Sequence, residues 1–223
     1  MVKKKLNVSY KKTRLIPGKA PSEEVQKKFI KKILRCMRRA EKGEEYIIFS
    51  DPMHQVHNSE NSYAWQFRGK EGTRYVLANS GRKRLNIIGA LNPIILKPEI
   101  ILTEDSCDGS FIEALLFEIR KSYPDDKLIR IFLDNASYQH TEEVKETAKR
   151  LNIKLEYLPP YSPNLNLIER LWKFFKKKII KNKYYETFAK FKKAISDFFK
   201  NFDDYIEELR SIITDKFEII KSG

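Results

Sequence analysis

The sequence predicts an α/β fold in which helices cover a mixed β-sheet, and two observations support this prediction. Two short apolar runs, YIIFSD at residues 46–51 and LIRIFLD at residues 128–134, each close on an aspartate. Nearly continuous apolar runs of this length are typical of strands that are buried on both faces. After the second run, strand patterns and helix patterns alternate, which indicates parallel strands with helices on the faces of the sheet.

The chain begins with a basic segment followed by a helix. Residues 1–20, MVKKKLNVSYKKTRLIPGKA, contain no periodic apolar face and are predicted to form a linker or arm. Pro21 and Ser22 are favourable residues for starting a helix, which we expect to end near Gly43. Its inward residues recur at four-residue steps: Val25, Phe29, Ile33 and Met37.

Three strands are then expected to form an antiparallel meander. The first is residues 46–51, and a polar loop follows it. The second and third are Arg74–Ala78 and Leu85–Leu91, which are separated by an Asn-Ser-Gly turn signal. Residues 98–103 form one further candidate strand.

The second half of the chain has the pattern of alternating helices and strands. A helix over residues 109–121 is expected to turn four residues inward: Phe111, Ala114, Leu115 and Ile119. The elements predicted after it are a strand at 128–133, a helix at about 141–151, a strand at 153–158 and a helix from about 163. A meander followed by this βαβα order is the order of the ribonuclease H-like fold.

Residues 184–223 are again helical in pattern, and their apolar residues lie on one face. These residues are Phe188, Phe191, Ile195, Phe198, Phe202, Ile206, Leu209 and Ile213. We expect these C-terminal helices to pack on or extend the domain and to complete its core. A dimer contact is the alternative.

The composition indicates a polyanionic partner. Lysine and arginine number 44 and the acidic residues 30, so the formal net charge is 44 − 30 = +14. A basic surface attracts phosphates over a long range, which favours nucleic acid over a membrane surface. No apolar segment is long enough to span a membrane and no signal core follows the basic N-terminus, so a cytoplasmic protein is expected. The two cysteines, Cys36 and Cys107, are too few for a disulfide framework or a zinc site.

A third acidic residue, Glu169, lies in the segment PPYSPNLNLIERLWKFFK. Ser162 is a good N-cap residue and Pro163 suits the first helical position, so a helix is expected to start here. Glu169 follows Leu165 by four residues, which places it about 40° away on the helical wheel, beside the apolar stripe that faces the sheet. That stripe consists of Leu165, Ile168, Trp172, Phe175 and Ile179.

Each acid also has an ordinary explanation. Asp51 and Asp134 could cap turns after their strands. Glu169 could form a solvated pair with Lys173 that contributes about 0.2 to 0.5 kcal/mol. In combination the three acids favour a shared site, because ligands in open α/β sheets bind at the carboxyl ends of the strands.

Three gathered carboxylates require a cation. At about 4 Å and an effective dielectric constant of about 20, each close pair would repel by about 4 kcal/mol. Because no cluster of Cys and His lies nearby, the hard oxygen ligands indicate Mg²⁺ or Mn²⁺ rather than zinc. Two such ions about 3.5 to 4 Å apart can activate a water or a 3′-hydroxyl and stabilise the leaving oxygen of a phosphodiester.

Three segments resemble the catalytic motifs of the mariner-like DDE transposases, particularly those of prokaryotic insertion sequences. LDNASYQH resembles the second motif, LPPYSPNLNLIERLWKFFK the third, and FSDPMHQVHNSENSYAW the first. Glu169 lies 35 positions after Asp134 (169 − 134 = 35), so 34 residues lie between the two acids, a spacing typical of that superfamily. The resemblance covers roughly residues 6–181.

This resemblance implies a ribonuclease H-like catalytic domain at residues 21–183, with Asp51, Asp134 and Glu169 as the metal-binding catalytic triad and two Mg²⁺ or Mn²⁺ ions as cofactors. The implied activity is cleavage of DNA at transposon ends, followed by attack of the freed 3′-hydroxyl on target DNA. The residues PPYSP before the third acid are expected to shape the turn that aims Glu169, and Trp172 is expected to be a core residue.

Further residues are assigned supporting roles. Asn135 and His140 lie in the second motif and could orient a phosphate or a water, and His54 lies just past Asp51. Each of the three could equally be an ordinary loop residue. The basic residues proposed to contact DNA are Lys3, Lys4, Lys5, Lys11, Lys12, Arg14, Lys173 and Lys176.

The family normally carries an N-terminal helix-turn-helix region, and none is recognisable in this sequence. The resemblance therefore implies the catalytic half of a transposase, a homodimer on DNA, a separate helix-turn-helix polypeptide as a possible partner, and a nucleoid-associated protein of the prokaryotic cytoplasm. One alternative is a catalytically inactive remnant or partner subunit that binds DNA. Another is a stand-alone nuclease of the same fold that acts on RNA hybrids or branched DNA.

Overall fold

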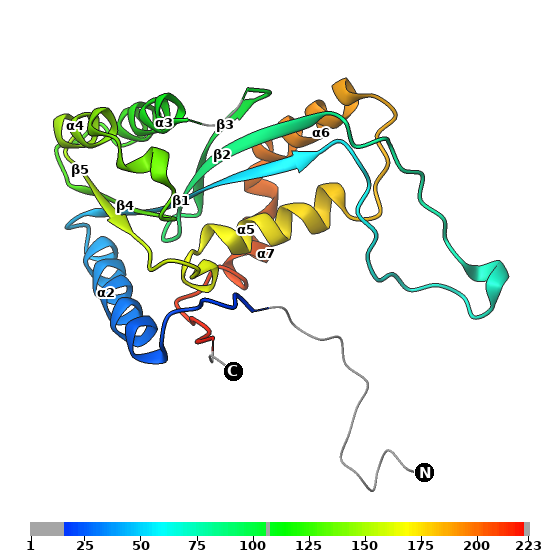
Figure 1. The fold of residues 1–223 in the computed structure, drawn as a ribbon, viewed down its shortest axis with the longest axis horizontal. Helices are drawn as coiled ribbons and strands as arrows, with labels where there is room; N and C mark the ends of the chain where they lie inside the picture. Colours follow the sequence, from blue (N-terminus) through cyan, green and yellow to red (C-terminus); the bar gives the residue numbers. More distant parts are fainter. Residues whose placement is uncertain (1–15, 106–107, 221–223) are drawn as a thin grey trace, which may run out of the picture.

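The computed structural model describes residues 16–105 and 108–220, which form a five-stranded sheet with helices on both faces (Figure 1). The basic residues Lys3 to Arg14 and Cys107 lie outside these ranges. The strands are β1 (Tyr46–Val56), β2 (Arg84–Asn92), β3 (Lys97–Thr103), β4 (Ile129–Leu133) and β5 (Ile153–Tyr157). The helices are α2 (Glu23–Glu41), α3 (Gly109–Ser122), α4 (Glu142–Arg150), α5 (Ile168–Phe175), α6 (Phe188–Lys200) and α7 (Ile206–Arg210).

The sheet has the strand order β3-β2-β1-β4-β5, so β1 is the central strand. β1 pairs with β2, and β2 with β3, in antiparallel fashion. β1 pairs with β4, and β4 with β5, in parallel fashion. The predicted mixed sheet, a meander followed by βαβα, is therefore present.

Two apolar layers enclose the sheet. On one face, α3 and α4 cover residues such as Ile48, Ile88 and Ile131. On the other face, α2, α5, α6 and α7 pack over residues such as Phe49 and Phe132, whose rings stack at 5.0 Å between centroids. The C-terminal residues predicted to face inward belong to this second layer, with Phe188 and Ile206 at its margin. None of the helices in the described part of the chain is both long and apolar enough to cross a membrane.

The predicted composition of the meander is wrong in one strand. Residues 74–78 are not a strand but part of the long β1–β2 loop, residues 57–83, which extends away from the domain in Figure 1. The third strand of the meander is β3, which the sequence offered as a further short strand. Residues 74–78 favour β structure, but a strand also needs a paired neighbour and a buried face. Tyr75 and Leu77 are 86% and 67% exposed, and none of the described strands pairs with residues 74–78.

β1 is longer than predicted, because it continues for five residues past Asp51 to Val56. The parallel pairing with β4 ends at Ser50 and Leu133, and beyond this point β1 pairs only with β2. Pro52 is therefore tolerated within the strand, since a proline on a free strand edge breaks no ladder hydrogen bond. Asp51 lies inside its strand and at the end of the parallel pair.

The helix predicted from Ser162 begins later. Residues Pro163–Leu165 form a 3₁₀ turn, and α5 starts at Ile168. The Ser162 hydroxyl donates to the Pro160 carbonyl at 3.3 Å and does not cap a helix. The chain between β5 and α5 contains three prolines, which limits regular helix formation before Asn166.

The other helices start and end near their predicted bounds. Ser22 caps α2 through the Val25 backbone N–H at 3.4 Å, and Gly43 after the helix has a φ of 73°. Two residues predicted to face inward are exposed, Val25 on α2 and Ala114 on α3. Val25 lies in the first turn, at the end of the helix where less of the domain covers it.

α2 is joined to the sheet by a buried ion-pair network, which consists of Glu45, Arg130, Glu156 and Lys32. Arg130 contacts Glu45 at 3.0 Å and also pairs with Glu156, which in turn pairs with Lys32 on α2. Arg130, Glu45 and Glu156 are each less than 10% exposed. Every buried carboxylate in this network therefore has a cationic partner.

Candidate active site

The pairing of β1 with β4 brings two of the predicted acids together. The register ends with Ser50 opposite Leu133, so Asp51 and Asp134 come next on neighbouring strands. Side chains alternate along a strand, and the Asp51 side chain lies on the same face as Phe49, while that of Asp134 lies on the same face as Phe132. Both carboxylates consequently point to the face of the sheet that α5 covers.

Glu169 reaches the same place from α5. After β5 the chain passes through the proline-rich segment and the 3₁₀ turn, where Tyr161 adopts a left-handed φ of 56°. The Glu169 backbone N–H then donates to the Asn166 carbonyl at 3.2 Å. Asn166 is itself fixed to β1, because its Nδ2 donates to the Ser50 carbonyl at 3.1 Å. The first turn of α5 is thus attached to the strand that carries Asp51.

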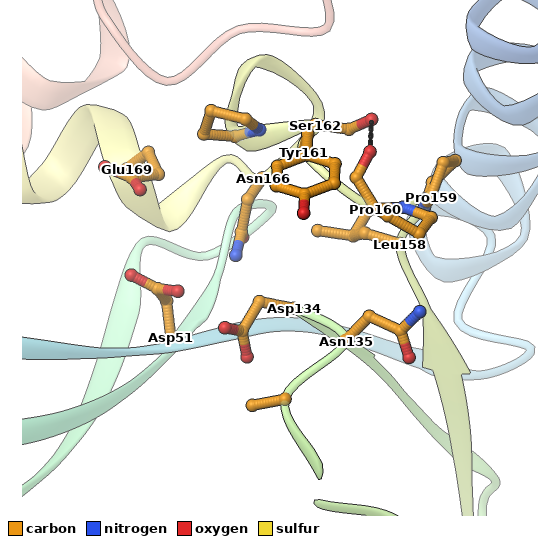
Figure 2. Close-up of a pocket in the computed structure, with 12 residues that line it drawn as sticks. Asp51, Asp134, Asn135, Leu158, Pro159, Pro160, Tyr161, Ser162, Asn166 and Glu169 are labelled. Carbon is orange, nitrogen blue, oxygen red and sulfur yellow. Dashed lines mark hydrogen bonds between the residues drawn. The ribbon is translucent and has the colours of Figure 1, made fainter. Parts of the chain in front are cut away.

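The three acids line one pocket of about 490 Å³. Figure 2 shows Asp51 and Asp134 on the sheet side and Glu169 on the opposite side. The remaining wall comes from the segment between β5 and α5, and Asn135 lies beside Asp134. A second cleft of about 940 Å³ adjoins the pocket and shares Glu169 and Asn166 with it.

Asp51 has the most perturbed carboxyl group of the site. Burial raises its pKa, the charges of Glu169 and Asp134 raise it further, and a hydrogen bond from Trp172 lowers it only in part. The result is a pKa of about 8. At neutral pH and without a bound cation, Asp51 is therefore mostly protonated.

The other two acids are shifted in the same direction. Burial raises the pKa of Asp134, and a hydrogen bond from Gln139 opposes this shift. Burial also raises the pKa of Glu169, as does the charge of Asp134, while Lys173 and Lys176 lower it. All three carboxyl groups thus hold protons more tightly than in water, and a cation placed among them would reverse this effect.

The donor chemistry of the pocket fits Mg²⁺ or Mn²⁺. Its three acidic side chains offer only oxygen atoms, which are the ligands that these hard cations prefer. In the part of the chain that the structure describes, no three His, Cys, Asp or Glu side chains converge closely enough to hold one ion. The acids therefore border the pocket without forming a closed set of ligands.

A model of the DDE superfamily endonuclease family matches residues 46–192, which is more than half of the chain. The chain belongs to the DDE superfamily endonucleases. This match contains all three acids and every strand of the sheet.

Two curated relatives resemble parts of this DDE endonuclease. An uncharacterized protein of Sinorhizobium fredii, y4pE/y4sA, is 32% identical over 82 residues, which are 37% of this chain and 58% of the relative. The insertion element IS630 uncharacterized 39 kDa protein of Shigella sonnei is 26% identical over 140 residues, which are 62% of this chain and 40% of the relative. The chain thus spans about half the length of the curated relatives it matches.

Solved structures of Mos1 transposase share the fold of this DDE endonuclease. The Mos1 strand transfer complex matches 95% of this chain and 63% of that chain, with a TM-score of 0.68 and 15% identity. The catalytic domain of Mos1 mariner transposase matches 89% of this chain and 94% of that chain, with a TM-score of 0.57 and 12% identity. The predicted ribonuclease H-like fold is confirmed.

The structure separates the three predicted supporting residues. Asn135 lines the pocket and is hydrogen-bonded to His140 Nε2 at 2.6 Å. His140 stacks on Tyr157 at 4.0 Å between ring centroids and does not line the pocket, so Asn135 is its contact with the pocket wall. His54 follows Asp51 by three residues on β1, so its side chain points to the opposite face of the sheet. There it contacts Asn86 at 2.7 Å. His54 is therefore not brought to the site.

Three residues that the sequence did not assign to the site contact its acids or line it. Gln139 is fully buried and donates a hydrogen bond from Nε2 to Asp134 Oδ1. Trp172, predicted to be core, is buried but also donates from Nε1 to Asp51 Oδ2 at 3.2 Å. Asn166 is buried in the pocket wall. Gln139 and Asn166 lie within the second and third motifs, so the motifs were the available signal.

The two predicted DNA-contacting lysines within the described residues lie on and just after α5, beyond Glu169. Lys173 is exposed and lines the adjoining cleft. Lys176 is half-buried and pairs with Glu60 of the β1–β2 loop at 3.3 Å. Lys173 is thus available to a ligand, while Lys176 already has a protein partner.

Proposed function

We propose that this chain is the catalytic domain of a transposase, which cleaves DNA at transposon ends and joins the freed 3′-hydroxyl to target DNA. The observation that carries the proposal is that Asp51, Asp134 and Glu169 line one pocket, each with a raised pKa. A site made of mutually repelling acids is expected where a cation binds. The insertion-element relative and the Mos1 structures support the choice of transposition over other endonuclease reactions.

Asp51, Asp134 and Glu169 would hold two Mg²⁺ or Mn²⁺ ions. Solved paired-end complexes of Mos1 contain Mg or Mn, which supports this choice of metal. When bound, such ions supply Lewis-acid stabilisation of the charge that develops on a phosphodiester. The chain itself fixes the carboxylates: Gln139 holds Asp134, and Trp172 holds Asp51.

DNA would approach through the larger cleft that shares Glu169 with the pocket. Its lining includes Lys173 and Lys216, both exposed, which can contact phosphates next to the reacting one. The formal net charge of +14 favours the same partner.

We further propose that the protein acts as a homodimer on DNA. The β1–β2 loop exposes several large apolar side chains, which a second copy of the chain would cover. They are Trp65, Phe67, Tyr75 and Leu77. A separate helix-turn-helix polypeptide as the partner that recognises the transposon ends, and a nucleoid-associated location in a prokaryotic cytoplasm, belong to the same proposal.

Nicking of supercoiled plasmid DNA in Mn²⁺ tests the catalytic part of the proposal. Wild-type protein should nick the DNA, and Asp134→Asn should reduce the rate by at least about a hundredfold, because loss of a direct metal ligand exceeds the 10- to 100-fold typical of residues behind the ligands. Asp126→Asn is a matched control, because it makes the same chemical change at an exposed aspartate in the turn before β4.

Two outcomes would contradict the catalytic proposal. Equal nicking by wild type and Asp134→Asn would indicate a contaminating nuclease or a different site. Salt-sensitive DNA binding without nicking and without Mn²⁺ uptake would favour the inactive DNA-binding remnant.

A further inference from the structure

Trp172 links the candidate site to the core. Its indole is 3% exposed, and its Nε1–H donates to Asp51 Oδ2 at 3.2 Å. It lies on α5 three residues after Glu169, so one helix carries both an acid of the site and the donor to another acid. We propose that Trp172 is a positioning residue for Asp51, and that Gly89 provides the space this arrangement requires. The proposal rests on the proposed function.

Gly89 faces the indole from β2. It pairs directly with Asp51 in the antiparallel register, and directly opposed residues point to the same face of a sheet. A Cβ atom added at Gly89 would lie 2.6 Å from Trp172 Cζ2 and 3.2 Å from Ile100 Cδ1. Because non-bonded carbon atoms do not approach to 2.6 Å, any larger residue would push the indole away from β2. The Ser50 hydroxyl holds the strand in place by donating to the Gly89 carbonyl at 2.8 Å.

α6 also contacts the indole. Phe199 meets Trp172 edge to face, with ring centroids 6.4 Å apart and an interplanar angle of 89°. The indole therefore contacts both β2 and α6, and this packing fixes the direction of its N–H. This contact is a route by which a C-terminal helix contributes to the site.

A fixed N–H donor has a specific effect on Asp51. A hydrogen bond to an ionised carboxylate is about twice as strong as one between neutral groups. A carboxylate that is held through Oδ2 presents Oδ1 in a defined direction instead of rotating. Trp172 thereby prepares Asp51 for a cation in the pocket, without contacting the reacting phosphate.

The first test is Mn²⁺ binding by calorimetry to wild type and to Trp172→Phe, which keeps an aromatic ring but removes the donor. We expect Mn²⁺ to bind about tenfold to a hundredfold more weakly to Trp172→Phe. The melting temperature should also fall, because the smaller ring leaves a cavity and Asp51 loses its donor. Trp65→Phe is the matched control, because it makes the same substitution at an exposed tryptophan of the β1–β2 loop and should bind Mn²⁺ as the wild type does.

A double-mutant cycle tests the role of Gly89. Gly89→Ala should weaken Mn²⁺ binding in the wild-type background, because it displaces the indole. In the Trp172→Phe background the same change should cost little, because the smaller ring leaves room for the added methyl group. Additive effects of the two substitutions would contradict the proposal.

Fluorescence provides a readout that keeps Trp172 in place. The chain has two tryptophans, so Trp65→Phe leaves Trp172 as the single one. Paramagnetic Mn²⁺ should quench its emission, while Mg²⁺ should not.

The outcomes separate the two proposals. Unchanged Mn²⁺ affinity in Trp172→Phe, or Mn²⁺ binding without quenching, would overturn the role of Trp172 and leave the proposed function intact. Absence of Mn²⁺ binding to the wild type would overturn both.

Discussion

Two groups of carboxylates, one buried and one partly buried, lie on the same face of the sheet and differ in whether the protein itself neutralises them. In the ion-pair network, Glu45 and Glu156 contact Arg130, and Lys32 joins them from α2. In the pocket, Asp51 and Asp134 receive hydrogen bonds only from neutral groups among the described residues. Glu45 lies six residues before Asp51 (51 − 45 = 6), and Arg130 lies four residues before Asp134 (134 − 130 = 4).

The difference is visible in the proton affinities. Burial alone would raise the pKa of Glu156, but the hydrogen bonds and charges of Lys32 and Arg130 outweigh it, and its pKa is lowered. Burial and the neighbouring acids raise the pKa of Asp51 to about 8. The comparison shows that the fold provides cationic partners for the buried acids of the ion-pair network. The uncompensated acids are therefore consistent with a cation supplied from solution.

The largest expected effect on stability concerns the ion-pair network. Arg130→Ala would leave Glu45 and Glu156 buried without their shared cation, and we expect a loss of about 3 to 5 kcal/mol in the free energy of unfolding. Urea unfolding monitored by circular dichroism measures this loss. Arg39→Ala is the matched control, because Arg39 also contacts Glu45, at 3.5 Å, but is about half exposed, so it should cost less than about 1 kcal/mol. Equal small losses would show that Glu45 is neutralised in another way.

In the pocket, removing an acid is expected to stabilise the fold, whereas removing Arg130 from the network destabilises it. The folded-state pKa of Asp51 lies above its ordinary value of 3.8, so the native protein retains a proton that the unfolded chain releases. Without metal, Asp51 therefore destabilises the fold increasingly between about pH 4 and about pH 8, by at most about 1.4 kcal/mol per pH unit, and by a constant amount above pH 8.

Asp51→Asn removes this dependence. In EDTA, the variant should gain stability over the wild type as the pH rises from 5 to 8, and the gain should level off above about pH 8. Urea unfolding at several pH values measures it, with Asp126→Asn as the control of equal charge. A difference between Asp51→Asn and wild type that does not vary with pH would refute the raised pKa.

The smallest expected effect concerns DNA. Lys173→Ala removes an exposed cation beside Glu169, and the slope of log affinity against log salt concentration should fall by about one unit. Fluorescence anisotropy with labelled duplex DNA at several salt concentrations measures the slope. Lys121→Ala makes the same charge change on α3, on the other face of the sheet, and should leave the slope unchanged. Equal slopes for both variants would show that Lys173 does not contact the DNA.

The sequence predicted the elements that depend on local pattern. The apolar runs at β1 and β4 and the alternation that follows them predict the parallel strands of the sheet, because buried parallel strands are apolar on both faces. Residues 74–78 contain the same residue types, but whether a partner strand lies beside them depends on distant parts of the chain. The length of β1 was underestimated for a similar reason, since Pro52 is tolerated only because β4 ends where it does.

The sequence predicted some residues of the candidate site and missed the contacts between others. The three acids could be found because each stands in a recognisable motif. Trp172 could be predicted as core from its helical stripe, but its contact with Asp51 joins residues 121 positions apart. Gly89 carries no signal in the sequence, because its role depends only on the ring that packs against it.

The position of Asp51 has a mechanical consequence. Asp51 is paired with Gly89 of β2, and the residue before it, Ser50, is paired with β4. Asp134 directly follows the last paired residue of β4, so the sheet holds both acids in place. Glu169 is carried by α5, a helix of eight residues that follows a 3₁₀ turn. One wall of the pocket is therefore made of paired strands and the other of a helix that is tied to them by Asn166 and Trp172. A displacement of α5 against the sheet would break both of these contacts, so a cation is expected to meet a site of nearly fixed shape.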